Sequence, residues 1–72
     1  MDTPTQQEVK GAWKQFRGKL QEKWGELTSD ELDRLEGMRD QIEGYIEQKT
    51  GEARHAIRDV IDRASREAKY TF

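Results

Sequence analysis

Apolar side chains recur along the first third of the chain at the spacing of one face of an α-helix. Successive members are separated by four, three, four and four positions: Val9, Trp13, Phe16, Leu20 and Trp24. At about 100° per residue these positions share one side of a helix. A capping box at Thr5 and Glu8 marks the start, and Gly25 stands where a left-handed residue would end the helix. The pattern predicts a helix over roughly residues 6–24.

A second capping box, formed by Thr28 and Glu31, predicts a short helix that Gly37 ends or bends. Leu27 before this cap and Leu32 after it have the spacing of a hydrophobic staple.

Two further helices are predicted in the second half of the chain. One carries Met38, Ile42, Tyr45 and Ile46 and stops before Gly51. The other begins near Glu52 and carries Ala53, Ile57, Val60, Ile61, Ala64 and Ala68. Residues 1–5 and 70–72 are expected to fray, although the two aromatic residues of the second segment could fold back onto the core. The prediction is a single all-α domain over residues 1–72, a small bundle of about four helices.

The glycines are regularly spaced, at positions 11, 18 and 25 and again at 37, 44 and 51. Laying residues 11–26 over residues 37–52 gives six identities in sixteen positions. This repeat predicts two helical hairpins, neither of which can bury its apolar stripe alone, so that they pack against each other. The predicted common core consists of Trp13, Phe16, Leu20, Leu32, Ile42, Ile46, Ile57, Val60 and Ile61.

Glycine inside a helix costs roughly 1 kcal/mol relative to alanine, so the mid-helix glycines require a reason. One reason is that a neighbouring helix backbone crosses them, and another is that they line a shallow groove for a partner. We expect close crossing at Gly18 and Gly44, and therefore destabilisation by alanine at both. The candidate partner surface, kept as the alternative, consists of Gly11, Gly18, Gly44, Lys10, Lys14 and Arg17.

Composition restricts the possible functions. The 72 residues are 32% hydrophobic and 39% charged, with a net charge of −2 and no cysteine. The small core predicts marginal stability, with weak self-association as one possible support. The acidic balance argues against nucleic-acid binding, since such domains are usually basic; a surface of ion pairs is the better interpretation. No apolar run is long enough for a membrane span, and we expect a cytoplasmic protein.

No pattern of catalytic or ligand-binding residues stands out. The chain lacks a phosphate-binding glycine loop after a strand, a nucleophile elbow and a metal-ligand cluster. His55 is the only histidine. Trp13 and Trp24 share the apolar face of the first helix, which favours core packing over ligand stacking. We therefore expect no enzyme activity, no cofactor and no metal.

Three segments resemble the CsbD-like family of small bacterial stress proteins: WKQFRGKL at 13–20, WGELTSD at 24–30 and EGMRDQIEG at 36–44. The likeness covers roughly residues 8–52. It implies two crossed helical hairpins in a SAM-domain-like arrangement and expression under general stress in bacteria, and it brings no catalytic residue or cofactor.

Two functions follow as hypotheses. The first is a protective or structural stress factor that acts through a hydrated, charged surface. The second is an interaction module that docks a protein partner, or less favourably DNA, through a glycine and aromatic surface. Burial of Trp13 and Trp24, with no contiguous apolar patch elsewhere, would favour the first hypothesis. Exposure of one tryptophan beside Gly11 or Gly18 would favour the second.

Overall fold

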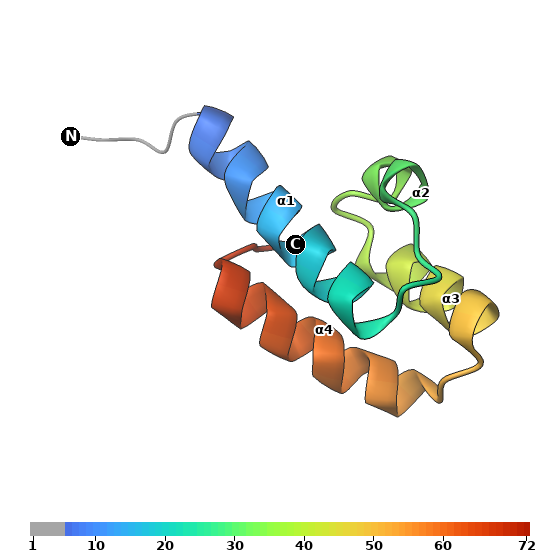
Figure 1. Cartoon of the computed structure of the whole chain (residues 1–72). Helices are drawn as coiled ribbons and strands as arrows, with labels where there is room; N and C mark the ends of the chain where they lie inside the picture. The colour runs from blue at the N-terminus through green and yellow to red at the C-terminus, as the bar shows by residue number, and fades with distance from the viewer. Residues whose placement is uncertain (1–5) are drawn as a thin grey trace.

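Four α-helices joined by short turns make up the structure (Figure 1). The computed structural model describes the backbone of residues 6–72 and the side chains of residues 11–72. The helices are α1 (Gln6–Lys23), α2 (Ser29–Arg34), α3 (Arg39–Thr50) and α4 (Arg54–Ala68). The part of the chain that the structure describes contains no strand, which confirms the all-α prediction. The side chains of the predicted capping box, Thr5 and Glu8, lie outside the described part of the structure.

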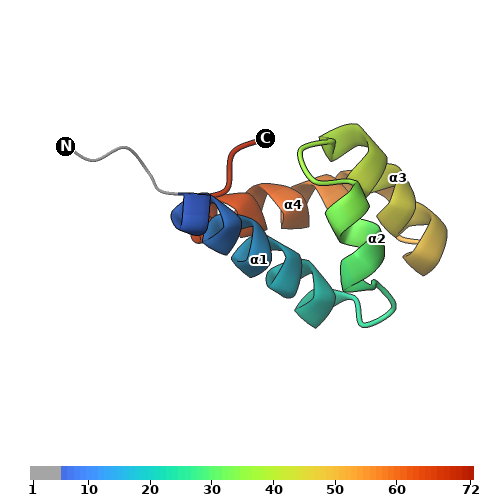
Figure 2. The ribbon, with the colours of Figure 1, turned by 90° about the horizontal axis from the view of Figure 1, so that it is seen from above.

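Helix α4 is the element against which the other long helices pack. It runs beside α1 in the opposite direction, and it also packs against α3 (Figure 1). The short α2 lies between the end of α1 and α3 (Figure 2). The two halves of the chain are unequal, because α1 and α2 have 18 and 6 residues whereas α3 and α4 have 12 and 15.

One hydrophobic cluster joins all four helices. Eight of the nine predicted core residues are buried in it, and the ninth, Val60, is partly buried against it. Trp24, Leu27, Ala64 and Ala68 complete the cluster. Phe16 and Ile46, which the repeat pairs with Ile42 and Leu20, are fully buried together with those partners. The apolar positions that correspond in the repeat are therefore buried in both halves of the chain.

Thr28 caps α2 as its sequence pattern predicts. Its backbone is extended, and its Oγ1 accepts a hydrogen bond from the Glu31 amide at 3.3 Å. Leu27 and Leu32 are both buried, as a hydrophobic staple requires.

The glycines of the repeat do not share a backbone conformation. Gly37 and Gly51 have φ of 83° and 74°, a left-handed region that glycine enters without steric cost. Gly51 caps the end of α3, whereas α2 ends earlier, with Leu35 as its cap, and Gly37 lies in the turn between α2 and α3. Gly25 has no positive φ, so the prediction of a left-handed cap after α1 is wrong. Instead, the Trp24 amide still donates to the Leu20 carbonyl at 2.8 Å, and the Leu27 amide donates to the Trp24 carbonyl at 3.2 Å. The chain thus leaves α1 through a turn with ordinary backbone angles.

The expected close crossing at Gly18 and Gly44 is also wrong. A methyl group added at Gly18 would meet no atom within 4 Å, and one added at Gly44 would meet only the Arg54 guanidinium at 3.8 Å. No helix backbone approaches either position, because α4 packs on the opposite, apolar faces of α1 and α3. We therefore reverse the expected sign of both alanine substitutions.

Residues 70–72, hereafter the tail, pack on α1 instead of fraying. The Tyr70 ring lies 5.1 Å from that of Phe16 and 5.2 Å from that of Trp13, measured between centroids. The Phe72 ring meets Phe16 edge-on at 5.3 Å. Tyr70 is half-buried against the core, and Phe72 keeps its ring contact with Phe16 although it is 39% exposed. These aromatic contacts outweigh the disorder expected of a chain end.

Candidate functional site

The predicted partner surface is only partly exposed. Lys14 is exposed, and Gly11 and Gly18 are half-buried on α1 with open space above them. Gly44 lies on α3 beneath the Arg54 guanidinium. The side chain of Lys10 lies outside the described residues. Whether these positions bind a partner stays a prediction.

Arg17, the last member of that surface, is engaged within the fold. Its guanidinium donates to both carboxylate oxygens of Asp33 on α2, at 2.8 and 3.0 Å. The Trp13 indole donates to the same carboxylate at 2.7 Å. The hydrogen bond from Trp13, and then those from Arg17, hold the pKa of Asp33 below its ordinary value. Arg17 therefore ties α1 to α2.

A second polar cluster joins the start of α2 to α3. The Tyr45 hydroxyl donates to the Glu31 carboxylate and accepts a hydrogen bond from the Thr28 amide at 3.1 Å. In a standard capping box the glutamate would take that amide itself; here the tyrosine stands between them. The hydrogen bonds from Tyr45 and then Thr28 lower the pKa of Glu31. The cap is thus also a contact between α2 and α3.

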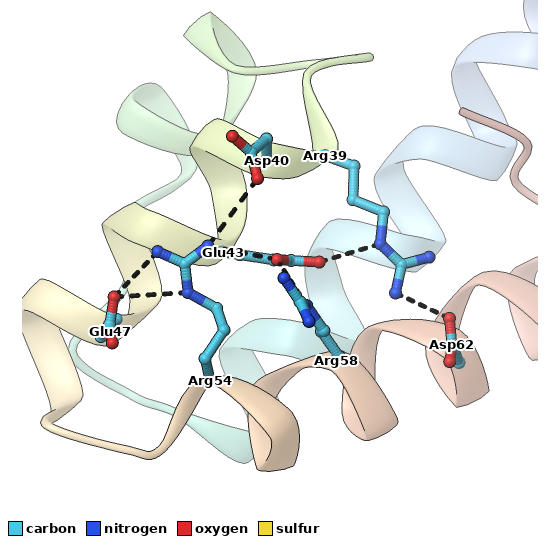
Figure 3. A network of polar contacts seen from close by, with 7 residues as sticks. All are labelled: Arg39, Asp40, Glu43, Glu47, Arg54, Arg58 and Asp62. Atoms are coloured by element: carbon cyan, nitrogen blue, oxygen red, sulfur yellow. Dashed lines mark hydrogen bonds and ion pairs between the residues drawn. The ribbon is translucent and has the colours of Figure 1, made fainter.

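The densest polar cluster surrounds Glu43, which is 3% exposed and points from α3 toward α4 (Figure 3). One carboxylate oxygen accepts from Arg39 at 3.0 Å. The other accepts from Arg58 at 3.1 Å and from Arg54 at 3.3 Å. Because Arg54 and Arg58 belong to α4, a single buried carboxylate fastens the first turns of α4 to α3.

Two of these arginines also form ion pairs with acidic residues other than Glu43. Arg39 also pairs with Asp62 at 2.7 Å, and Arg54 pairs with Glu47 at 2.9 Å. Each guanidinium therefore bridges the buried carboxylate and a more exposed one (Figure 3).

The ionisation of Glu43 follows from these contacts. Burial on its own would raise the pKa of this carboxyl, but hydrogen bonds from Arg39, Arg58 and Arg54 outweigh burial, so its pKa lies below the ordinary value. A carboxylate held ionised has no proton to donate near neutral pH, and three arginine hydrogen bonds already occupy most of its acceptor sites. This geometry suits a structural link between helices better than acid–base chemistry.

The sequence did not reveal the Glu43 cluster. The spacing of Arg54 and Arg58 suits a basic ridge on the surface, yet both guanidinium groups bind the buried carboxylate of Glu43, Arg58 from a side chain that stays largely exposed. The available signal was the position of Glu43 between the buried Ile42 and Ile46, four residues after Arg39. The broader prediction of a surface laced with ion pairs agrees with these contacts.

Metal and membrane sites find no support in the described residues. None of their histidine, aspartate and glutamate side chains gather in a group of three or more that could hold a metal ion. None of the described helices is both long and apolar enough to cross a membrane.

The fold and its clusters define a small all-α domain whose helices are tied by an apolar core and internal ion pairs. The chain belongs to the CsbD-like family, whose profile matches residues 7–59 and so extends into α4. The resemblance inferred from the sequence is confirmed.

The relatives are bacterial proteins of similar length. UPF0337 protein YjbJ of Escherichia coli (strain K12) is 45% identical over 56 residues, covering 76% of this chain and 81% of the relative. UPF0337 protein ECA0631 of Pectobacterium atrosepticum is 40% identical over 63 residues, covering 88% and 91%. UPF0337 protein RPA4217 of Rhodopseudomonas palustris is 50% identical over 54 residues, covering 75% and 82%. No solved structure matches this chain.

Proposed function

We propose that this chain is a non-enzymatic stress-response protein that protects other macromolecules through weak contacts of its charged, hydrated surface. The stress context is what membership of the CsbD-like family implies. The observation that carries the proposal is the burial of Trp13 and Trp24, which are 3% and 5% exposed. Their burial removes the two largest aromatic side chains from any docking surface.

The composition of the surface supports the same function. Met38 and Phe72 are the only large apolar residues among those described that are more than a third exposed. Charged residues make up 39% of the chain and nearly cancel, at a net charge of −2. A surface with both signs interspersed and without a broad apolar patch stays hydrated and makes only weak contacts.

The polar clusters support a role without catalysis. Acids and bases that could have carried chemistry bind partners on neighbouring helices instead: Glu43 binds Arg58, and Arg17 binds Asp33. Their hydrogen bonds contribute to the fold and leave little capacity for a substrate.

A drying assay tests the proposal. A stress-sensitive enzyme, lactate dehydrogenase, is dried and rehydrated with the purified full chain or with an equal mass of lysozyme, and the recovered activity is measured. We expect higher recovery with the chain, increasing with its amount. Recovery no higher than with lysozyme would contradict a protective function.

A pair of variants separates surface-wide protection from docking through the first helix. One variant combines Lys14→Glu with Gly18→Arg, at an exposed position and at one with open space above it. The control combines Arg63→Glu with Gln41→Arg, at exposed positions on α4 and α3, and changes the net charge equally. The proposal predicts that both variants protect as well as the unmodified chain. Loss in the first variant alone would favour the docking module instead.

A further inference from the structure

The tail occupies an aromatic crevice made of Trp13 and Phe16 on α1 and Arg39 at the start of α3. Tyr70 stacks on Phe16, with the two ring planes inclined by 24°. Phe72 meets the rings of both Phe16 and Tyr70 edge-on, and the Arg39 guanidinium lies 5.7 Å from its centroid. The crevice therefore recognises two aromatic side chains spaced two residues apart, with a cation beside the second.

The turn that leads into the crevice is strained. Lys69 has φ of 57° and ψ of 36°, in the left-handed region. The amides of Lys69 and Tyr70 donate to the carbonyls of Arg66 and Ser65, the arrangement of a Schellman motif.

That motif usually carries glycine at the position of Lys69. The other two left-handed residues of the described chain, Gly37 and Gly51, are glycines, so Lys69 is the exception. A side chain at this position disfavours the turn by roughly 5- to 30-fold. The strain is located at the hinge of the tail.

Lys69 is the hinge between α4 and the tail. A change of its backbone angles frees the tail but leaves the crevice empty. If Lys69 takes ordinary helical angles, α4 continues and the rings of Tyr70 and Phe72 leave Phe16. Only a segment with the same two rings can then restore the aromatic packing of the crevice. The structure shows one such segment in place, and every copy of the chain carries it.

We propose that two copies of this chain exchange their tails, each inserting Tyr70 and Phe72 into the crevice of the other. The exchange is reciprocal and closes on a dimer. It restores every aromatic contact of the monomer and relieves the left-handed turn in both copies. Because two hinges contribute, the lysine favours the dimer by roughly 25-fold or more over a chain with glycine at this position.

Concentration decides which form predominates. The tail of a monomer competes as a tethered ligand whose effective concentration is on the order of millimolar. Exchange is therefore expected only in concentrated protein, with the monomer predominating in dilute solution.

Sedimentation equilibrium of the full chain tests the exchange, at concentrations from about 10 μM to about 1 mM, which approach the effective concentration of the tether. Lys69→Gly removes the strain of the closed turn, whereas Lys69→Val increases it, because a β-branched residue tolerates positive φ poorly. We expect the association constant to fall by roughly 25-fold or more in the glycine variant and to rise in the valine variant. Equal constants in the two variants would overturn the proposal.

A second variant tests whether the rings hold the dimer together. Tyr70→Ser with Phe72→Ser removes both inserted side chains and leaves Phe16 in place, and far-UV circular dichroism establishes that the helices persist. The dimer should be lost. A dimer that persists, or a valine variant that stays monomeric at every concentration, would refute tail exchange.

Discussion

The two ends of α4 are held to the rest of the molecule by different chemistry. At its start, Arg54 and Arg58 bind the buried carboxylate of Glu43 on α3. At its far end, Ala64 and Ala68 are buried, and the tail beyond them stacks Tyr70 on α1. We refer to these as the polar end and the aromatic end.

The comparison indicates that the contacts that stabilise the fold differ from the contacts that fix the orientation of its helices. Burial of apolar rings is favourable in itself, at about 25 cal/mol per Å² removed from water. A buried carboxylate costs free energy unless it is paired, so a buried ion pair often adds little net stability but is costly to break. The aromatic end should therefore supply most of the stability, and the polar end should fix how α4 lies against α3.

The largest effect is expected from Phe16→Ala at the aromatic end. Phe16 is fully buried and its ring meets those of Trp13, Tyr70 and Phe72. Truncating such a residue costs about 3–5 kcal/mol of unfolding free energy. Urea denaturation measures the change, and a loss below about 1 kcal/mol would show that the aromatic end is not the main source of stability.

Glu43→Gln at the polar end should cost less, about 2 kcal/mol. Removing one partner of a buried ion pair usually costs more, but Arg39 and Arg54 keep Asp62 and Glu47 as partners and remain partly exposed. Urea denaturation at neutral pH measures this loss. A loss as large as that of Phe16→Ala would contradict the division between the two ends.

The same variant should also change the response to acid. The pKa of Glu43 is lowered in the folded chain, so its contribution is present above the unfolded pKa of about 4.3 and is lost as the pH falls through the folded pKa. The unmodified chain should lose stability below about pH 4.5. Glu43→Gln should lose less, with the remainder coming from Glu31 and Asp33, whose pKa values are lowered too. Identical acid profiles would show that Glu43 is not ionised by its arginines.

Thr28 caps α2 and contacts neither end of α4. Thr28→Ala therefore provides a reference for the stability losses at the two ends. It removes the acceptor of the Glu31 amide and the hydroxyl that donates to the Glu31 carboxylate. The expected cost is about 1 kcal/mol. Thr28→Ser keeps the cap oxygen and should cost little, and an unchanged urea midpoint in the alanine variant would refute the cap.

The smallest effects are expected from alanine at the two mid-helix glycines. Gly18→Ala meets open space and should stabilise by up to about 1 kcal/mol through helix propensity. Gly44→Ala should also stabilise, by no more than that, since its methyl would make ordinary contact with Arg54 at the polar end. A lower urea midpoint in either variant would show a close approach that the structure lacks.

The sequence predicts the helices and the core well because burial follows helical spacing. Phe16, Ile42 and Ile46 lie on apolar stripes that can be counted along the chain, and all three are fully buried. The Thr28 cap is a local pattern within four residues, so it too can be recognised directly.

The features that the sequence did not predict depend on partners far along the chain. Glu43 looks like a surface residue until α4 brings Arg54 and Arg58 to it. The tail has only three residues, too few for any periodicity, and its position depends on the turn at Lys69. Small side chains at Gly18 and Gly44 permit a close crossing but do not cause one, which is why the expected crossing is absent.

The proposed function depends most directly on the burial of both tryptophans, and fluorescence tests it. We predict that the folded full chain emits at a clearly shorter wavelength than the urea-unfolded chain and that iodide quenches it weakly, since Trp13 and Trp24 are 3% and 5% exposed. Emission at the wavelength of the unfolded chain, or strong quenching of either tryptophan in a variant with the other replaced by phenylalanine, would place an aromatic side chain at the surface. That result would contradict protection through a charged surface and favour a docking module.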